Sequence, residues 1–248
     1  MDQVLLITGG SRGIGAATAL LAAQRGYAVA VNYASNSLAA DEVVRTIRAG
    51  GGTAMAVQAD VGDEAQVLAM FEKVDAKLGR LTALVNNAGV VDVQARVEQM
   101  SVARLERMFR VNVIGSFICA REAVRRMSTR HGGSGGAIVN ISSGAARLGS
   151  PDQYVDYAAS KGAIDTFTIG LAKEVAAEGI RVNAVRPGLI DTEIHASGGM
   201  PDRAFELAPT VPMQRTGSAE EIAGAILCLL SAEASYTTMA LLDVTGGR

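Results

Sequence analysis

Aromatic residues and cysteine are scarce in this 248-residue sequence. Phe, Trp and Tyr together make up 4% of the chain, and Trp is absent, whereas hydrophobic residues reach 49% and glycine occurs 28 times. A core of Ala, Val, Leu and Ile broken by glycine turns suits parallel strands covered by helices better than an aromatic-rich β-sandwich. The two cysteines, Cys119 and Cys228, allow neither a disulfide framework nor a CxxC metal site. We therefore expect a reducing, cytoplasmic location.

Histidine and net charge are equally limited. The two histidines, His131 and His195, exclude a zinc site made of three histidines and weaken a Ser-His-Asp hydrolase, so no metal is expected. The 23 Lys and Arg against 25 Asp and Glu give a net charge of -2, too balanced for a nucleic-acid binder. Apolar runs stay far below the roughly 18 residues that span a bilayer, and no basic leader follows Met1. The expected partners are small molecules, with no nucleic acid and no membrane.

Short apolar runs typical of strands alternate with longer stretches of helical period along the whole chain. The expected strands lie at 4–8, 28–32, 53–58, 83–86, 137–142, 181–185 and 241–244, and the expected helices near 13–25, 36–49, 63–78, 101–130, 155–178 and 218–231. This alternation predicts one doubly wound α/β domain over residues 1–248, with a parallel sheet and helices on both faces. Residues 191–217 lack a clear period, and so long a loop predicts a lid over a substrate site, in which His195 could orient a substrate.

A glycine-rich turn follows the first expected strand directly. Residues 9–15 read GGSRGIG and lead into a good helix start. Glycines at 9, 13 and 15 would permit a tight turn, let backbone N–H groups approach a pyrophosphate, and allow the helix to pack close to the strand. The spacing GxxxGxG differs from the commoner GxGxxG, so a merely tight strand-to-helix turn is the alternative.

Tyr157 and Lys161 are four residues apart in an expected helix, which places them on one face. A free phenol has a pKa of about 10, and a lysine ammonium within about 4 to 6 Å favours the phenolate and lowers that value. Tyr157 would then serve as a general acid and base near neutral pH.

Further motifs stand in register with these over the whole chain: NNAG at 86–89, Asn112, the serine pair at 142 and 143, YAASK at 157–161, and PG at 187–188 followed by Thr192. Their order and spacing resemble the short-chain dehydrogenase/reductase family, and in particular its 3-oxoacyl-carrier-protein reductases and glucose 1-dehydrogenase-like members. The resemblance implies a Rossmann fold with a seven-stranded sheet of order 3-2-1-4-5-6-7, oxidoreduction of a small carbonyl or alcohol substrate with a nicotinamide coenzyme, and a homo-oligomer, most commonly a tetramer.

The resemblance also implies a catalytic group of Asn112, Ser143, Tyr157 and Lys161. Ser143 would stabilise charge developing on the carbonyl oxygen, Lys161 would also hold the nicotinamide ribose, and Asn112 would extend a proton relay. Ser143 precedes Tyr157 by 14 residues, one more than is common in related chains, so Ser142 is kept as an alternative. The alternative function is a nucleotide-binding regulatory protein of the same fold without turnover.

The coenzyme site that the resemblance implies would consist of Gly9, Ser11, Arg12, Gly13, Ile14, Gly15, Asn32, Tyr33, Asp60, Val61, Asn86, Ala88, Gly89, Tyr157, Lys161, Pro187, Gly188, Ile190 and Thr192. A site for NAD usually has an acid at the end of the second strand, where this chain has Asn32 and Tyr33, whereas Arg12 could pair with a 2′-phosphate. We therefore expect NADP(H) to be preferred, with NAD(H) as the alternative. Asp60 resembles the family's adenine contact, although it could equally cap the helix expected near residue 63.

Overall fold

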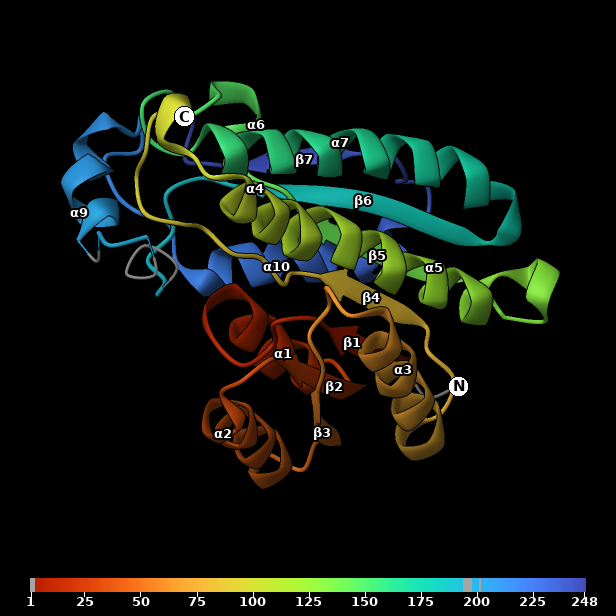
Figure 1. Cartoon of the computed structure of the whole chain (residues 1–248). Coiled ribbons are helices and arrows are strands. Elements are labelled where there is room, and N and C mark those ends of the chain that lie inside the picture. The colour runs from red at the N-terminus through yellow and green to blue at the C-terminus, as the bar shows by residue number, and fades with distance from the viewer. Residues whose placement is uncertain (1–2, 194–197, 201) are drawn as a thin grey trace.

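Seven strands rich in β-branched residues form one parallel sheet at the centre of the molecule (Figure 1). The computed structural model describes residues 3–193, 198–200 and 202–248. Its strands are β1 (Gln3–Ile7), β2 (Tyr27–Tyr33), β3 (Ala54–Gln58), β4 (Ala83–Asn86), β5 (Gly136–Ile141), β6 (Ile180–Pro187) and β7 (Leu241–Val244). Their order is β3-β2-β1-β4-β5-β6-β7 with every neighbouring pair parallel, which confirms the expected topology.

Helices connect the strands and cover both faces of the sheet. They are α1 (Gly13–Gln24), α2 (Ser37–Ala49), α3 (Glu64–Leu78), α4 (Val102–Phe109), α5 (Gly115–Met127), α6 (Ala145–Leu148), α7 (Val155–Val175), α9 (Arg203–Leu207) and α10 (Ala219–Leu230). Short helical turns are η1 (Val97–Gln99), η3 (Thr129–His131), η4 (Ala176–Glu178), η5 (Ala208–Thr210) and η6 (Ala232–Ala234). In the described part of the chain no helix has the length and apolar character needed to cross a membrane.

The single helix expected at 101–130 is wrong. The chain instead forms α4, a π-helical turn η2 (Arg110–Ile114) and α5, and α5 ends where Ser128 caps η3. The π turn widens the helix at Asn112, whose side chain bonds to the backbone of Val90 in a neighbouring loop. Such bulges are frequent at functional sites because they redirect a side chain within a helix.

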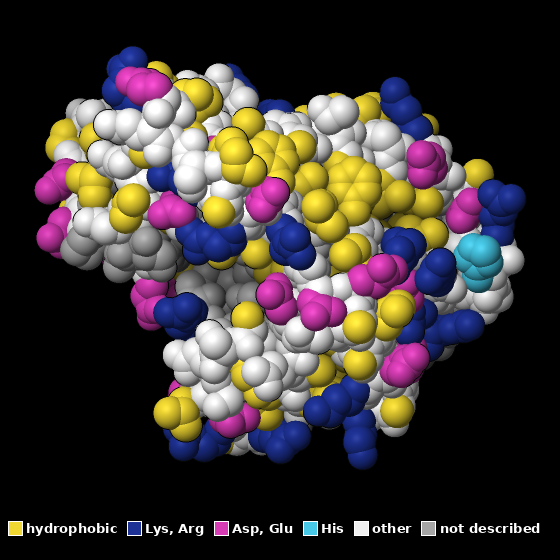
Figure 2. All heavy atoms as spheres, in the orientation of Figure 1, with side chains coloured by type: hydrophobic (Ala, Val, Ile, Leu, Met, Phe, Trp, Pro, Cys, Tyr) yellow, Lys and Arg dark blue, Asp and Glu magenta, His cyan; other side chains and the backbone are white. Residues whose placement is uncertain are grey.

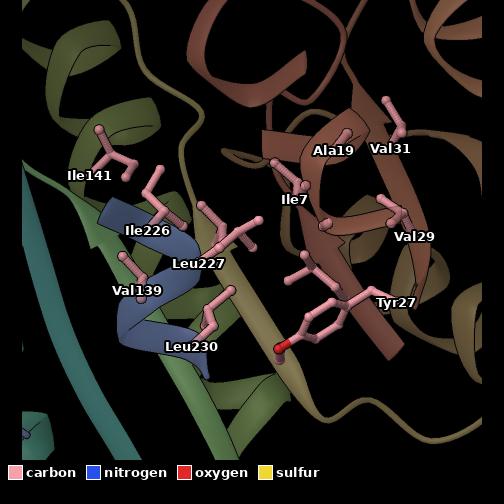
Figure 3. Close-up of a cluster of buried hydrophobic side chains, with 14 of the residues drawn as sticks. Ile7, Ala19, Tyr27, Val29, Val31, Val139, Ile141, Ile226, Leu227 and Leu230 are labelled. Atoms are coloured by element: carbon pink, nitrogen blue, oxygen red, sulfur yellow. The ribbon is translucent and has the colours of Figure 1, made fainter. Parts of the chain in front are cut away.

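The two faces of the sheet have separate hydrophobic cores because successive strand residues point to opposite sides. On one face Leu5 and Ile7 pack with α1, α2 and α10, and Figure 3 shows Ile226 and Leu227 of α10 against Val139 of β5. On the other face the intervening strand residues pack with α3, α5 and α7. Burial on both faces explains why the strands have nearly continuous apolar sequences.

The expected lid has more structure than its sequence indicates, since α9 and η5 lie within it. Its base is closed by backbone bonds: the Asp191 N–H donates to the Gly217 carbonyl (3.1 Å) and the Gly217 N–H donates to the Leu189 carbonyl (2.9 Å). Ser218 and Glu221 then form a capping box that starts α10. His195 and Pro201 lie outside the described residues.

Candidate active site

A cavity of about 640 Å³ lies at the carboxyl ends of the strands. It extends from Asn36 and Asp60, near the ends of β2 and β3, to Tyr157 and Thr192 beyond β5 and β6. Figure 2 shows the surface hollowed between the part that carries α9 and the part that carries α1 and α2. In open parallel sheets ligands bind at this edge, where the strand order reverses between β1 and β4.

The glycine segment forms one wall of this cavity. Gly13 has a φ of +51°, a left-handed conformation that glycine adopts without strain. A Cβ on Gly15 would lie 2.3 Å from the Gly9 carbonyl oxygen, so only glycine allows α1 to begin so close to β1. Arg12 occupies the N-cap of α1, and its side chain makes no capping hydrogen bond. The first-turn N–H groups of α1 are therefore not used by a side-chain cap, which suits an anion such as a pyrophosphate.

Two asparagines fix the glycine turn to its neighbours. The Asn32 side-chain oxygen accepts from the Gly9 N–H (3.1 Å), and its amide donates to the Ala59 carbonyl beyond β3 (3.0 Å). The Asn87 amide donates to the carbonyls of Thr8 and Gly9, both at 2.9 Å. Asn32 borders the cavity, as expected, but its side chain is engaged in holding the loop. Asn87 also lines the cavity.

Most of the residues expected to hold the coenzyme do line the cavity, and two do not. Asn86 is the last residue of β4 and is buried, and its amide donates to Asn140 (3.0 Å) and to the Ser116 carbonyl (3.2 Å). Its part in holding the coenzyme stays a prediction. Gly15 is also buried and acts by close packing.

Asp60 lines the cavity, and the alternative that it caps the next helix is wrong. The cap of α3 is Asp63, whose carboxylate accepts from the Gln66 N–H (3.1 Å). Asp60 instead accepts from the Gly62 N–H (2.8 Å) in the preceding turn.

The strand end that would hold an adenosine ribose carries no acid: residues 33–36 are Tyr, Ala, Ser and Asn, and all four line the cavity. Arg12 lies at the cavity rim, where its guanidinium pairs with Glu193 at 2.6 Å. Both side chains are more than half exposed, so this pair holds Arg12 only weakly.

Tyr157 and Lys161 lie side by side at the other end of the cavity. The Lys161 ammonium nitrogen is 5.6 Å from the centre of the Tyr157 ring, as the four-residue spacing on α7 predicts. Lys161 is buried, and its ammonium donates to the Ile141 carbonyl at 2.7 Å. Burial lowers the pKa of Lys161 to about 8, and the nearby Asp165 carboxylate opposes that change.

Asn112 reaches the same place from η2. Its side-chain oxygen accepts from the Val90 N–H (2.7 Å), and its amide donates to the Val90 carbonyl (3.0 Å) and to the Ser160 hydroxyl (3.1 Å). A Cβ on Gly89 would lie 3.5 Å from both the Asn112 oxygen and the Lys161 nitrogen. This asparagine is therefore a satisfied buried amide, and it borders Gly89 as the Lys161 ammonium does.

The two serines after β5 differ in their environments. Ser142 is buried, and its hydroxyl donates to the Lys161 carbonyl (3.2 Å). Ser143 is half-buried, and its oxygen accepts from the Ala145 N–H (3.1 Å), an arrangement that leaves the hydroxyl proton to point elsewhere. The residues between the serines and Tyr157 form α6 and a turn in which Ser150 and Asp152 have positive φ. The one residue by which the spacing from Ser143 to Tyr157 exceeds that of related chains lies within this connection.

Several cavity residues were missed by sequence reasoning. Tyr154 precedes Tyr157 by three residues, so helical spacing could have indicated it. Arg107 and Glu193 line the cavity without belonging to any motif. Thr245 and Arg248 reach it because β7 pairs with β6, a contact that no local signal reports.

The fold and the cavity together define a dinucleotide-binding protein of the doubly wound class. A family model described as Enoyl-(Acyl carrier protein) reductase matches residues 9–248. The chain is 59% identical over 245 residues to an uncharacterized oxidoreductase of Escherichia coli (strain K12), covering 99% of both chains. It is 39% identical over 246 residues to a 3-oxoacyl-[acyl-carrier-protein] reductase of Synechocystis sp., covering 99% of this chain and 96% of the relative.

Among solved structures, the short-chain dehydrogenase/reductase from Serratia marcescens matches with a TM-score of 0.91 and 36% identity, covering 99% of this chain and 97% of that chain. The protein belongs to the short-chain dehydrogenase/reductase family and is an NAD(P)-dependent oxidoreductase. These relatives favour an enzyme over the regulatory protein without turnover.

Proposed function

We propose that the protein is a reductase of carbonyl groups, or a dehydrogenase of secondary alcohols, in which Tyr157 is the general acid and base. The observation that carries this proposal is the Lys161 ammonium at 5.6 Å from the Tyr157 ring in a cavity suited to a dinucleotide. When bound, the nicotinamide coenzyme supplies or accepts the hydride. The uncapped start of α1 and the glycine turn would hold its pyrophosphate.

Side chains of the protein transfer the proton and stabilise the charges that form. The Tyr157 hydroxyl donates its proton to the carbonyl oxygen during reduction, and the phenolate takes the alcohol proton in the reverse direction. The Lys161 ammonium stabilises that phenolate, Ser143 donates a hydrogen bond to the oxygen that gains negative charge, and Asn112 continues the polar path beyond Lys161. We choose Ser143 over Ser142 because the Ser142 hydroxyl is buried and donates to the Lys161 carbonyl.

Replacing the tyrosine tests this assignment. Tyr157→Phe removes the proton donor and should lower kcat by roughly 100-fold or more, the usual contribution of a positioned acid. Tyr154→Phe removes the same atom from a neighbouring cavity residue and should keep most of the activity. Rates are followed by the absorbance of the reduced nicotinamide over a panel of ketones and alcohols. Activity of Tyr157→Phe within a few-fold of the wild-type protein would contradict the assignment.

We also propose that NADP(H) is preferred over NAD(H). Arg12 at the cavity rim would pair with the 2′-phosphate, and residues 33–36 offer no carboxylate to accept from a ribose 2′-hydroxyl. The weak pair with Glu193 leaves the guanidinium able to exchange partners.

Coenzyme titrations test the preference. Loss of a charge-assisted contact of about 1.5 to 3 kcal/mol should weaken NADPH binding by roughly 10- to 100-fold in Arg12→Leu and leave NADH binding nearly unchanged. Arg45→Leu, an exposed cation on α2 paired with Glu42, is the matched control and should change neither. Equal weakening of both coenzymes by Arg12→Leu would refute a 2′-phosphate contact.

We further propose that the chain assembles with copies of itself, as a tetramer. Figure 2 shows hydrophobic side chains gathered over α4, α5 and α7. Phe117 on α5 is 48% exposed and stacks on Phe167 of α7 with ring centres 3.9 Å apart, and Ile114 on η2 is 51% exposed. An exposed apolar face of this kind suits a second copy. Sedimentation of the wild-type protein and of Phe117→Asp should show loss of the assembly in the variant, and a monomeric wild-type protein would refute the proposal.

A further inference from the structure

Asp165 is a buried carboxylate that the proposed mechanism does not use. It lies one helical turn after Lys161 on α7, so the two side chains share a face of that helix. The residue is 8% exposed, and its Oδ1 atom is buried without a hydrogen-bond partner. Because an unpaired buried carboxylate oxygen is costly, this arrangement requires an explanation beyond packing.

The ion-pair partner of Asp165 bonds only one of the two carboxylate oxygens. Arg186 on β6 donates through Nε (3.1 Å) and through a terminal nitrogen (2.8 Å), and both bonds go to Oδ2. Arg186 also lies 3.6 Å from Asp243 on β7, which pairs with Arg147 at 2.6 Å. The Oδ1 atom takes no part in this network of ion pairs.

The charged groups that face Lys161 are few. On its own helix they are Tyr157 and Asp165. The strand β5 presents only the Ile141 carbonyl, and η2 presents the neutral Asn112 side chain.

Two cations on the other elements packed against α7 are bound to carboxylates of that helix. Arg104 of α4 pairs with Asp156, and Arg186 of β6 pairs with Asp165. In the part of the chain that the structure describes, Asp165 is thus the carboxylate that acts on the ammonium.

We propose that Asp165 is a positioning residue that acts through Lys161: its buried charge, held by Arg186, keeps the lysine ammonium protonated beside Tyr157. Burial alone can lower a lysine pKa to about 5 or 6, which would leave the amine neutral at pH 7. With Asp165 present the pKa of Lys161 is about 8, so roughly nine-tenths of the side chain is charged at pH 7. The inference rests on the proposed role of Tyr157.

The test measures the tyrosine directly and needs no substrate. The phenolate absorbance of the wild-type protein is titrated with pH, and the curve of Tyr157→Phe is subtracted to isolate Tyr157. For Asp165→Asn, the curve of the double variant Asp165→Asn with Tyr157→Phe is subtracted. The phenolate midpoint of Tyr157 in Asp165→Asn should be higher than in the wild-type protein by roughly one pH unit or more. The reason is that the neutralised lysine no longer stabilises the phenolate.

Glu122→Gln is the matched control. It removes a buried carboxylate of α5 that is also paired with arginines, away from Tyr157, and should leave the Tyr157 midpoint in place. If Asp165→Asn does not fold because Arg186 is left unpaired, Asp165→Asn with Arg186→Met removes both charges and should still raise the midpoint, by less than the single variant because the opposing Arg186 charge is also gone. An unchanged midpoint in the folded Asp165 variant, or an equal rise in Glu122→Gln, would overturn the inference. Failure of the proposed function would appear separately, as turnover retained by Tyr157→Phe.

Discussion

Replacing Lys161 with methionine tests how much the buried ammonium costs the fold. Burial lowers the pKa of Lys161 from its ordinary value of 10.5 to about 8. The gap of 10.5 − 8, about 2.5, corresponds to about 3 kcal/mol of folding free energy, because one pKa unit equals about 1.4 kcal/mol. This cost is present wherever the lysine is charged in both the folded and the unfolded chain.

The sign of the effect sets its dependence on pH. Since the folded pKa lies below the unfolded one, the unfolded chain binds more protons between about pH 8 and 10.5, and wild-type stability rises through that window. The cost is full at pH 7 and falls to about 1.4 kcal/mol at pH 9.5. Lys161→Met also loses the hydrogen bond to the Ile141 carbonyl, which reduces the gain in stability of the variant by about 1 kcal/mol at either pH. Lys161→Met should therefore be more stable than wild type by about 2 kcal/mol at pH 7 and by close to zero at pH 9.5.

Denaturant unfolding followed by circular dichroism at the two pH values measures the difference. Lys173→Met makes the same substitution at an exposed position of the same helix and should show no such dependence. If Lys161→Met were equally stabilising at pH 7 and pH 9.5, or destabilising at pH 7, the argument from burial of the charge would be refuted.

Two further substitutions probe the support of the site. Gly15→Ala would place a Cβ 2.3 Å from the Gly9 carbonyl oxygen and should abolish coenzyme binding. Gly162→Ala on α7 is the control, since its Cβ would meet no atom within 4 Å, and it should bind the coenzyme as the wild-type protein does. Fluorescence titration with the reduced coenzyme measures both. Asp156→Asn leaves the buried Arg104 unpaired and should lower the free energy of unfolding by about 3 to 5 kcal/mol. A loss below about 1 kcal/mol, the value for exposed pairs, would contradict the burial argument.

The strands could be predicted from the sequence because both faces of the sheet are buried. Val29, Ala30 and Val31 are all fully buried, so β2 has an unbroken apolar run, and its partners follow the same rule. β4 and β7 have the predicted limits, and the boundaries of the other five strands differ from the prediction by at most one or two residues. The strand order was expected from the family resemblance, and local pattern alone does not determine it.

The helix that carries Asn112 could not be predicted in detail. The apolar period continues through residues 101–130, and nothing in that period marks the π turn. The turn forms because the Asn112 side chain bonds both backbone groups of Val90, a partner 22 positions away in the sequence. A local pattern cannot report a contact of that range.

In the candidate active site, too, contacts within one helix could be predicted from the sequence, and contacts between distant segments could not. Tyr157 and Lys161 share a helix, so their spacing alone indicated their contact. Asn86 was assigned to the coenzyme with its neighbours. Its side chain bonds to the Ser116 carbonyl and to Asn140, which lie 30 and 54 positions away in the sequence, and no local pattern reports such contacts.

The two buried ion pairs of α7 explain how this helix can carry an unfavourable charge in a fixed place. Arg104 from α4 donates to both oxygens of Asp156, next to Tyr157, and Arg186 from β6 holds Asp165 one turn beyond Lys161. Breaking either pair would leave a buried ion unpaired at a cost of about 3 to 5 kcal/mol, comparable to the cost of burying the Lys161 ammonium. Sliding or rotation of α7 could expose the Lys161 ammonium to solvent only by breaking both ion pairs. The position of Tyr157 in the cavity is thus set by the fold before any coenzyme binds.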